Sequence, residues 1–201
     1  SDILAVPGSG PVRGVAYYKG LTYAWRNNAG GTALVLHVSS GSGWTAVPLG
    51  FELSFTVGLA AGIVEGNTVT GLSSGATGVV SRVVIQSGAF ATNNAAGRLI
   101  LSSTTGVFTA AEALQVAGTT RATASGAATA ITLLPDGRVV TDQGSFGGSG
   151  SASARMYGAA GVNRLFEFDG TVYVPIVTGM SPDAPDRAKV HQRHLFAAFG
   201  S

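Results

Sequence analysis

The stretch that decides the fold is residues 62–124, which opens GIVEGNTVTGLSSGATGVV (62–80) and closes GVFTAAEALQVAG (106–118). It is nearly uncharged, rich in β-branched residues and interrupted by glycine at short intervals. This pattern favours short strands joined by tight turns. Residues 62–69 and 106–114 share one pattern, in which an apolar pair follows a glycine and leads through a turn to a short apolar strand. We therefore expect two similar β-arches that close one small barrel or sandwich.

Glycine has two predicted roles within this stretch. Gly71, Gly75 and Gly78 are expected at turns or bulges, where the backbone needs a positive φ or approaches a neighbour closely. A glycine-rich run can also hold a phosphate, but residues 75–78 lack the Gly-Lys-Ser/Thr ending and a following helix. The structural interpretation is therefore favoured over a nucleotide site.

The composition fits an all-β protein and excludes several functions. Of the 201 residues, 45% are hydrophobic and only 11% are charged, and there is no cysteine for a disulfide or for thiol chemistry. A net charge of +2 spread over so few charges does not indicate nucleic-acid binding. No apolar run reaches the roughly 18 residues of a membrane span. The first residues do not have the pattern of a signal peptide, and we expect the chain to be a piece of a longer protein.

The flanking sequence predicts a second kind of β structure. Alternating residues around Lys19-Gly20 and Asp169-Gly170 indicate hairpins, and residues 191–199 place a basic turn before an aromatic strand in the same way. Recurring hairpins are typical of propeller blades. We predict a partial propeller-like domain of antiparallel blades from residues 1–57 and 133–201. Residues 58–132 would form the inserted module.

Candidate chemical sites are few, and a structural role is favoured at each. His37 falls within an apolar strand. His191 and His194 follow Asp183 and Asp186, but their spacing lies at a turn and lacks further ligands for a metal. Aspartates that precede glycine are favoured in turns, and no strand-turn-helix carries a nucleophilic serine. We predict no catalytic residues, no metal and no cofactor.

The remaining candidates are contact residues. An exposed Trp44 on a turn would offer a stacking surface for a sugar, although most alternating aromatic residues are expected in the core. Arg82 and Arg98, two of the few cations in the central stretch, are the other predicted contacts.

Several motifs in their order resemble those of tailed-bacteriophage virion proteins. The glycine-punctuated module is similar in TGLSSGATG (70–78), GRLIL (97–101) and GVF (106–108). Propeller-type segments of such proteins are similar to RMYG (155–158), GVNR (161–164), FEFDG (166–170), PIVTGM (175–180) and HLF (194–196).

The resemblance implies a structural protein of the tail nozzle or tail-tube end, without catalytic residues. It implies a location in the virion and partners that are copies of itself, assembled as a ring, and other virion proteins. An alternative is a tail module that binds a host receptor or glycan. A third hypothesis is a secreted β-propeller hydrolase or lectin.

Overall fold

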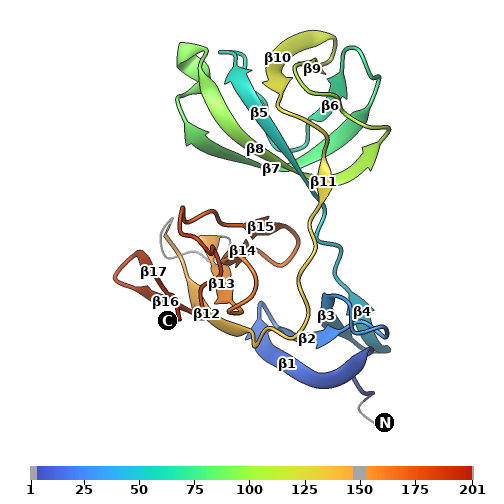
Figure 1. Cartoon of the computed structure of the whole chain (residues 1–201), viewed down its shortest axis with the longest axis vertical. Coiled ribbons are helices and arrows are strands. Elements are labelled where there is room, and N and C mark those ends of the chain that lie inside the picture. Colours follow the sequence, from blue (N-terminus) through green and yellow to red (C-terminus); the bar gives the residue numbers. More distant parts are fainter. Residues whose placement is uncertain (1–3, 147–152, 201) are drawn as a thin grey trace. The chain divides into compact units, whose positions relative to one another are not determined.

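The computed structural model describes residues 4–146 and 153–200, and its regular structure is almost entirely β-strand (Figure 1). The described residues contain no α-helix, and one short 3-10 helix, η1 (Phe90–Thr92), interrupts the strands. The all-β class predicted from composition is therefore confirmed. Two compact units divide the chain: the middle unit is Pro48–Ile131, and the flanking unit combines Ser1–Val47 with Thr132–Ser201.

The described residues of the flanking unit form three antiparallel sheets. The first has four strands in sequence order: β1 (Ser9–Tyr18), β2 (Leu21–Asn27), β3 (Leu34–Ser40) and β4 (Gly43–Ala46). The second also has four in sequence order: β12 (Val140–Gly144), β13 (Arg155–Ala159), β14 (Phe166–Phe168) and β15 (Tyr173–Pro175). The third is a hairpin of β16 (Arg187–His191) and β17 (His194–Ala198).

Buried aromatic rings join the first two sheets. Trp25 lies 5.9 Å from Phe166, and Tyr23 meets Phe168 edge to face at 5.3 Å between ring centroids. Phe166 also stacks on Tyr173 at 4.8 Å. Because such rings bury large apolar areas and prefer these offset geometries, they stabilise contacts between segments far apart in the sequence.

The three hairpins predicted in the flanks are all present. Tyr18 pairs with Leu21 across the Lys19-Gly20 turn, and His191 pairs with His194. The hairpin at Asp169 has a longer loop than a two-residue turn, since Phe168 pairs with Tyr173. The Asp169 carboxylate accepts hydrogen bonds from the backbone amides of residues 171 and 172, which holds this loop.

The middle unit is one seven-stranded antiparallel sheet in the order β10-β9-β6-β7-β8-β5-β11, with a further pairing of β10 with β5. Figure 1 shows β7 and β8 as long curved strands. The strands are β5 (Phe51–Gly58), β6 (Thr68–Gly71), β7 (Thr77–Ser87), β8 (Ala95–Thr105), β9 (Ala113–Val116), β10 (Thr119–Ala124) and β11 (Thr129–Ala130).

Small and aliphatic side chains, together with Phe55 and Phe108, fill the core of the middle unit. The buried cluster consists of Leu53, Phe55, Ile63, Val69, Ala76, Val80, Ala95, Leu99, Leu101, Phe108, Leu114, Ala122 and Ala124. The two similar segments predicted from sequence contribute β6 and β9, and these two strands pair with each other.

The structure assigns residues 51–57 differently from the sequence prediction, which placed them with the flanking strands. As part of β5, they pair with β8 and bury Leu53 and Phe55 in the core of the middle unit. The alternating pattern identified the strand correctly, but it contains no information about which sheet the strand joins.

The predicted turn positions are confirmed at Gly71 and Gly75, whereas Gly78 lies inside β7, paired in register with Thr104. Gly75 has a φ of +68°. A Cβ at Gly71 would come within 2.5 Å of the Glu112 carboxylate, and one at Gly78 within 2.7 Å of Leu101. Gly75 needs the left-handed backbone and Gly71 the close approach that glycine allows without strain.

Candidate interaction sites

One carboxylate, that of Glu112, holds two loops of the middle unit together. It accepts hydrogen bonds from the amide and hydroxyl of Ser73 at 3.2 and 2.9 Å, and from those of Ser74 at 3.0 and 2.9 Å. A fifth bond comes from the Thr109 amide at 2.6 Å. The loop between β6 and β7 is thereby tied to the loop between β8 and β9.

The environment of Glu112 favours its charged form. Its exposed fraction is only 6%. Burial acts to raise the pKa of this carboxyl, but the bonds from the Thr109 and Ser74 amides and from the serine hydroxyls outweigh it and lower the pKa to about 2. A buried carboxylate with this many donors is stabilised as the anion. Glu112 is therefore ionised at neutral pH, and its role in the described structure is to fix the backbone of both loops.

The two loops, residues 71–76 and 106–112, form what we call the two-loop surface. Each presents a large apolar side chain to solvent: Leu72 is 61% exposed and Val107 is 69% exposed. The Leu72 amide donates to Ala113 O at 2.9 Å, which fixes the backbone beside its exposed side chain. Apolar side chains held on an ordered backbone lose little conformational entropy on binding, which suits a contact with another protein.

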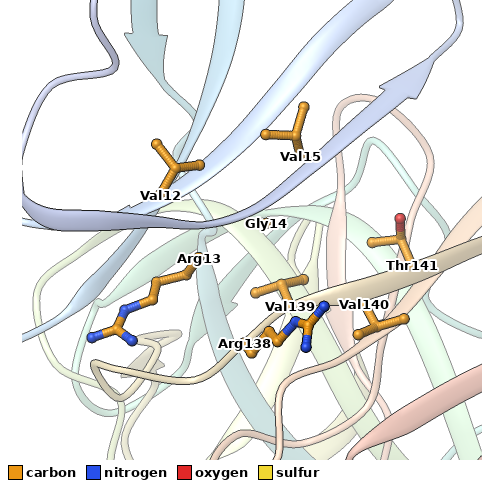
Figure 2. A pocket seen from close by; sticks show the side chains of 8 residues that line it. All are labelled: Val12, Arg13, Gly14, Val15, Arg138, Val139, Val140 and Thr141. Atoms are coloured by element: carbon orange, nitrogen blue, oxygen red, sulfur yellow. The ribbon is translucent and has the colours of Figure 1, made fainter.

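A second site lies in the flanking unit, in an open cavity of about 540 Å³ along β1. Its lining comes from four residues of β1, Val12, Arg13, Gly14 and Val15, and from residues 138–141 (Figure 2). Arg13 forms an ion pair with Asp136. Arg138 is exposed, and no acidic side chain of the described chain lies within ion-pair distance of it.

Trp44 is engaged within the flanking unit. It lies on the edge strand β4, paired in register with Ser39, and its ring is half-buried. The indole Nε1 donates a hydrogen bond to Leu4 O at 2.9 Å. The indole N–H is therefore already paired, and burial reduces the ring area available for stacking on a sugar.

Arg82 and Arg98 lie on neighbouring strands of the middle unit, β7 and β8, and both form ion pairs. Arg98 Nη1 lies 2.5 Å from Glu52 Oε2, with only 6% of the arginine side chain exposed. Arg82 Nε lies 2.8 Å from Glu65 Oε1, and the glutamate side chain is 59% exposed. The two arginines thus lie in one sheet of the middle unit, whereas Trp44 belongs to the flanking unit.

The histidines and aspartates considered as metal ligands do not converge. In the described residues no group of three or more His, Cys, Asp or Glu side chains is placed to hold a metal ion. Asp183 accepts hydrogen bonds from the amide and hydroxyl of Thr178 at 3.0 and 2.5 Å. His37 is buried within the first sheet.

Comparisons with protein-family models, with curated proteins and with solved structures find no match to this chain. Among the residues described, no helix is long and apolar enough to cross a membrane.

Sequence reasoning missed Glu112 and the cavity along β1. The signal for Glu112 was its isolation, since it is one of few charges in residues 62–124 and a lone charge in an apolar stretch needs a partner. The cavity had no comparable signal. Arg13 and Arg138 are separated by most of the chain, and only the tertiary fold brings them to one site.

Proposed function

We propose that the protein is a non-enzymatic structural component of a tailed-bacteriophage virion, in the tail or neck, and that it acts through subunit contacts in a ring assembly. The observation that carries this proposal is the two-loop surface. Two exposed apolar side chains, Leu72 and Val107, stand on loops fixed by a buried carboxylate. A rigid apolar contact is what a permanent assembly needs, and low surrounding charge makes it easy to desolvate.

The sheet topology supports the finer architecture that we propose. Two sheets of the flanking unit are four-stranded with strands in sequence order, as in propeller blades. In the middle unit, β10 and β5 pair although the sheet order places them far apart, which favours a closed barrel. We therefore propose a partial propeller with an inserted barrel.

Glycan or receptor binding through Trp44 is the weaker alternative. Its ring is half-buried and its Nε1 already donates to Leu4 O, which leaves a smaller surface for a sugar. No arrangement of described residues favours the hydrolase hypothesis.

The test is the solution mass of the protein over a range of concentrations, with electron microscopy of the largest species. We expect rings, and we expect Leu72→Ser combined with Val107→Ser to shift the population towards monomer. Leu134→Ser is the matched control, because Leu134 is also 61% exposed but belongs to the flanking unit. A protein that stays monomeric at every concentration and binds a glycan array would contradict the proposal and favour the alternative.

A further inference from the structure

The edge of β1 that faces away from β2 is partly open. β1 is the first strand of its sheet and pairs with β2 alone. Tyr17 pairs in register with Thr22, whose amide donates to Ser39 Oγ at 3.0 Å and so points towards β3. Tyr17 and Thr22 are therefore a pair without mutual backbone bonds, and the backbone groups of Tyr17 point outward.

The backbone groups of Val15, two residues earlier, point in the same direction. Successive residues of a strand alternate, so the N–H and C=O of Val15 also point to the outer edge. The carbonyls on either side are occupied there: Arg13 O accepts from Val139 N at 2.9 Å, and Tyr17 O accepts from Gln143 Nε2 at 2.7 Å. No group of the described chain bonds to Val15 at this edge.

The cavity beside Val15 has a definite chemical character. Val12, Val15, Val139 and Val140 give it apolar walls, and Val15 is 64% exposed. Its two charged lining residues are both arginines. Asp136 pairs with Arg13, while Arg138 has no carboxylate beside it in the described chain. The lining therefore carries an uncompensated positive charge.

We propose that this cavity binds a short extended segment of a partner protein, which pairs with the backbone of Val15 and places a carboxylate side chain against Arg138. Open backbone donors and acceptors at a strand edge are a template for another extended chain. Apolar walls next to a cation suit a segment in which valine-like and acidic residues alternate. The occupied carbonyls of Arg13 and Tyr17 limit the backbone pairing to one residue of β1.

This inference goes beyond the proposed function, because it assigns a second surface, in the other unit, and the chemistry of its partner. It does not involve Leu72 or Val107. If the segment does not bind, the proposal of a ring assembly is unaffected. Conversely, a protein that stays monomeric could still bind the segment.

The test uses the whole chain and a synthetic peptide of alternating valine and glutamate, followed by amide NMR and calorimetry. We expect the Val15 amide resonance to shift on binding. Arg138→Gln should weaken binding about tenfold, as for loss of a charge-assisted hydrogen bond. Arg187→Gln, an equal change of charge at an exposed arginine of β16, should leave it unchanged.

Three results would overturn the proposal. One is equal binding of a peptide with lysine in place of glutamate. Another is unchanged affinity in Arg138→Gln. The third is a site that acetate or inorganic phosphate fills equally well without moving the Val15 resonance, which would indicate a simple anion site. Val15→Pro removes the outward N–H and should abolish binding. If that variant does not fold, the shift of the Val15 amide resonance in the natural sequence still tests whether the segment pairs with Val15.

Discussion

The middle unit contains no tyrosine, tryptophan or histidine, whereas the flanking unit holds every one of those residues in the chain. The middle unit is made from one continuous segment, and its core consists mainly of small and aliphatic side chains together with Phe55 and Phe108. The flanking unit must join two segments separated by the whole insertion, and it does so with large rings. The difference shows that tyrosine and tryptophan rings are concentrated in the unit whose two segments are far apart in the sequence.

Substitution of Trp25 should produce the largest difference in stability between the two units. Trp25 is fully buried and contacts Phe166. Trp25→Ala should destabilise the flanking unit by about 4 kcal/mol through lost burial and a cavity. Fluorescence of the remaining Trp44 should report early unfolding, while amide hydrogen exchange in the middle unit stays slow. Equal loss of protection in both units would show that they unfold as one.

Glu112→Gln should have the converse effect, confined to the middle unit. The side-chain amide of the variant would turn its own N–H groups towards backbone and hydroxyl donors that bond to the carboxylate in the natural sequence. We therefore expect the free energy of unfolding to fall by about 3 kcal/mol. The folded pKa of about 2 lies below the ordinary value of 4.5, so this stabilisation is complete above pH 4.5 and disappears as pH falls towards 2. Amide hydrogen exchange, measured above pH 4.5 and again near pH 2, should show that the middle unit loses stability in acid. This loss should be smaller in the variant. Ser103→Ala, on β8, is a control in the same unit.

The two arginines of the middle unit should differ in importance. Arg98→Met breaks a largely buried pair with Glu52 and should cost about 3 kcal/mol. Arg82→Met breaks a pair whose glutamate is mostly exposed and should cost less than about 1 kcal/mol. Chemical denaturation followed by far-ultraviolet circular dichroism would measure both. A larger effect at Arg82 would mean that burial does not decide the strength of these pairs.

His37 should give the flanking unit a weak sensitivity to acid. Burial lowers the pKa of His37, and the charge of nearby Arg26 lowers it further. A hydrogen bond with the Val35 backbone acts in the opposite direction but is outweighed. The unfolded chain therefore takes up a proton more readily, and stability should decrease as pH falls below 6.5. Tryptophan fluorescence between pH 7 and about 5 should show this slope in the natural sequence and lose it in His37→Gln. An identical slope in both would assign it to another group.

The features that the sequence predicts correctly depend on residues close together in the chain. The Lys19-Gly20 turn and the positive φ of Gly75 follow from backbone sterics within a few residues. What could not be predicted depends on pairing across long distances. β5 joins its sheet through Leu99 and its neighbours, and Ser73 meets Glu112 39 positions away. Alternation is the same in every half-buried strand, so it cannot choose among partners.

The insertion also has a consequence for the order in which the chain folds during synthesis. Phe51 pairs with Ala130, and Ile131 N donates to Gly50 O, so the middle unit begins and ends at neighbouring points. It can fold as soon as it leaves the ribosome. Tyr18 and Trp25 emerge before the middle unit, whereas their ring partners Phe168 and Phe166 are made after it. For that interval the first sheet exposes its aromatic face, and we expect it to be the part of the nascent chain that chaperones bind.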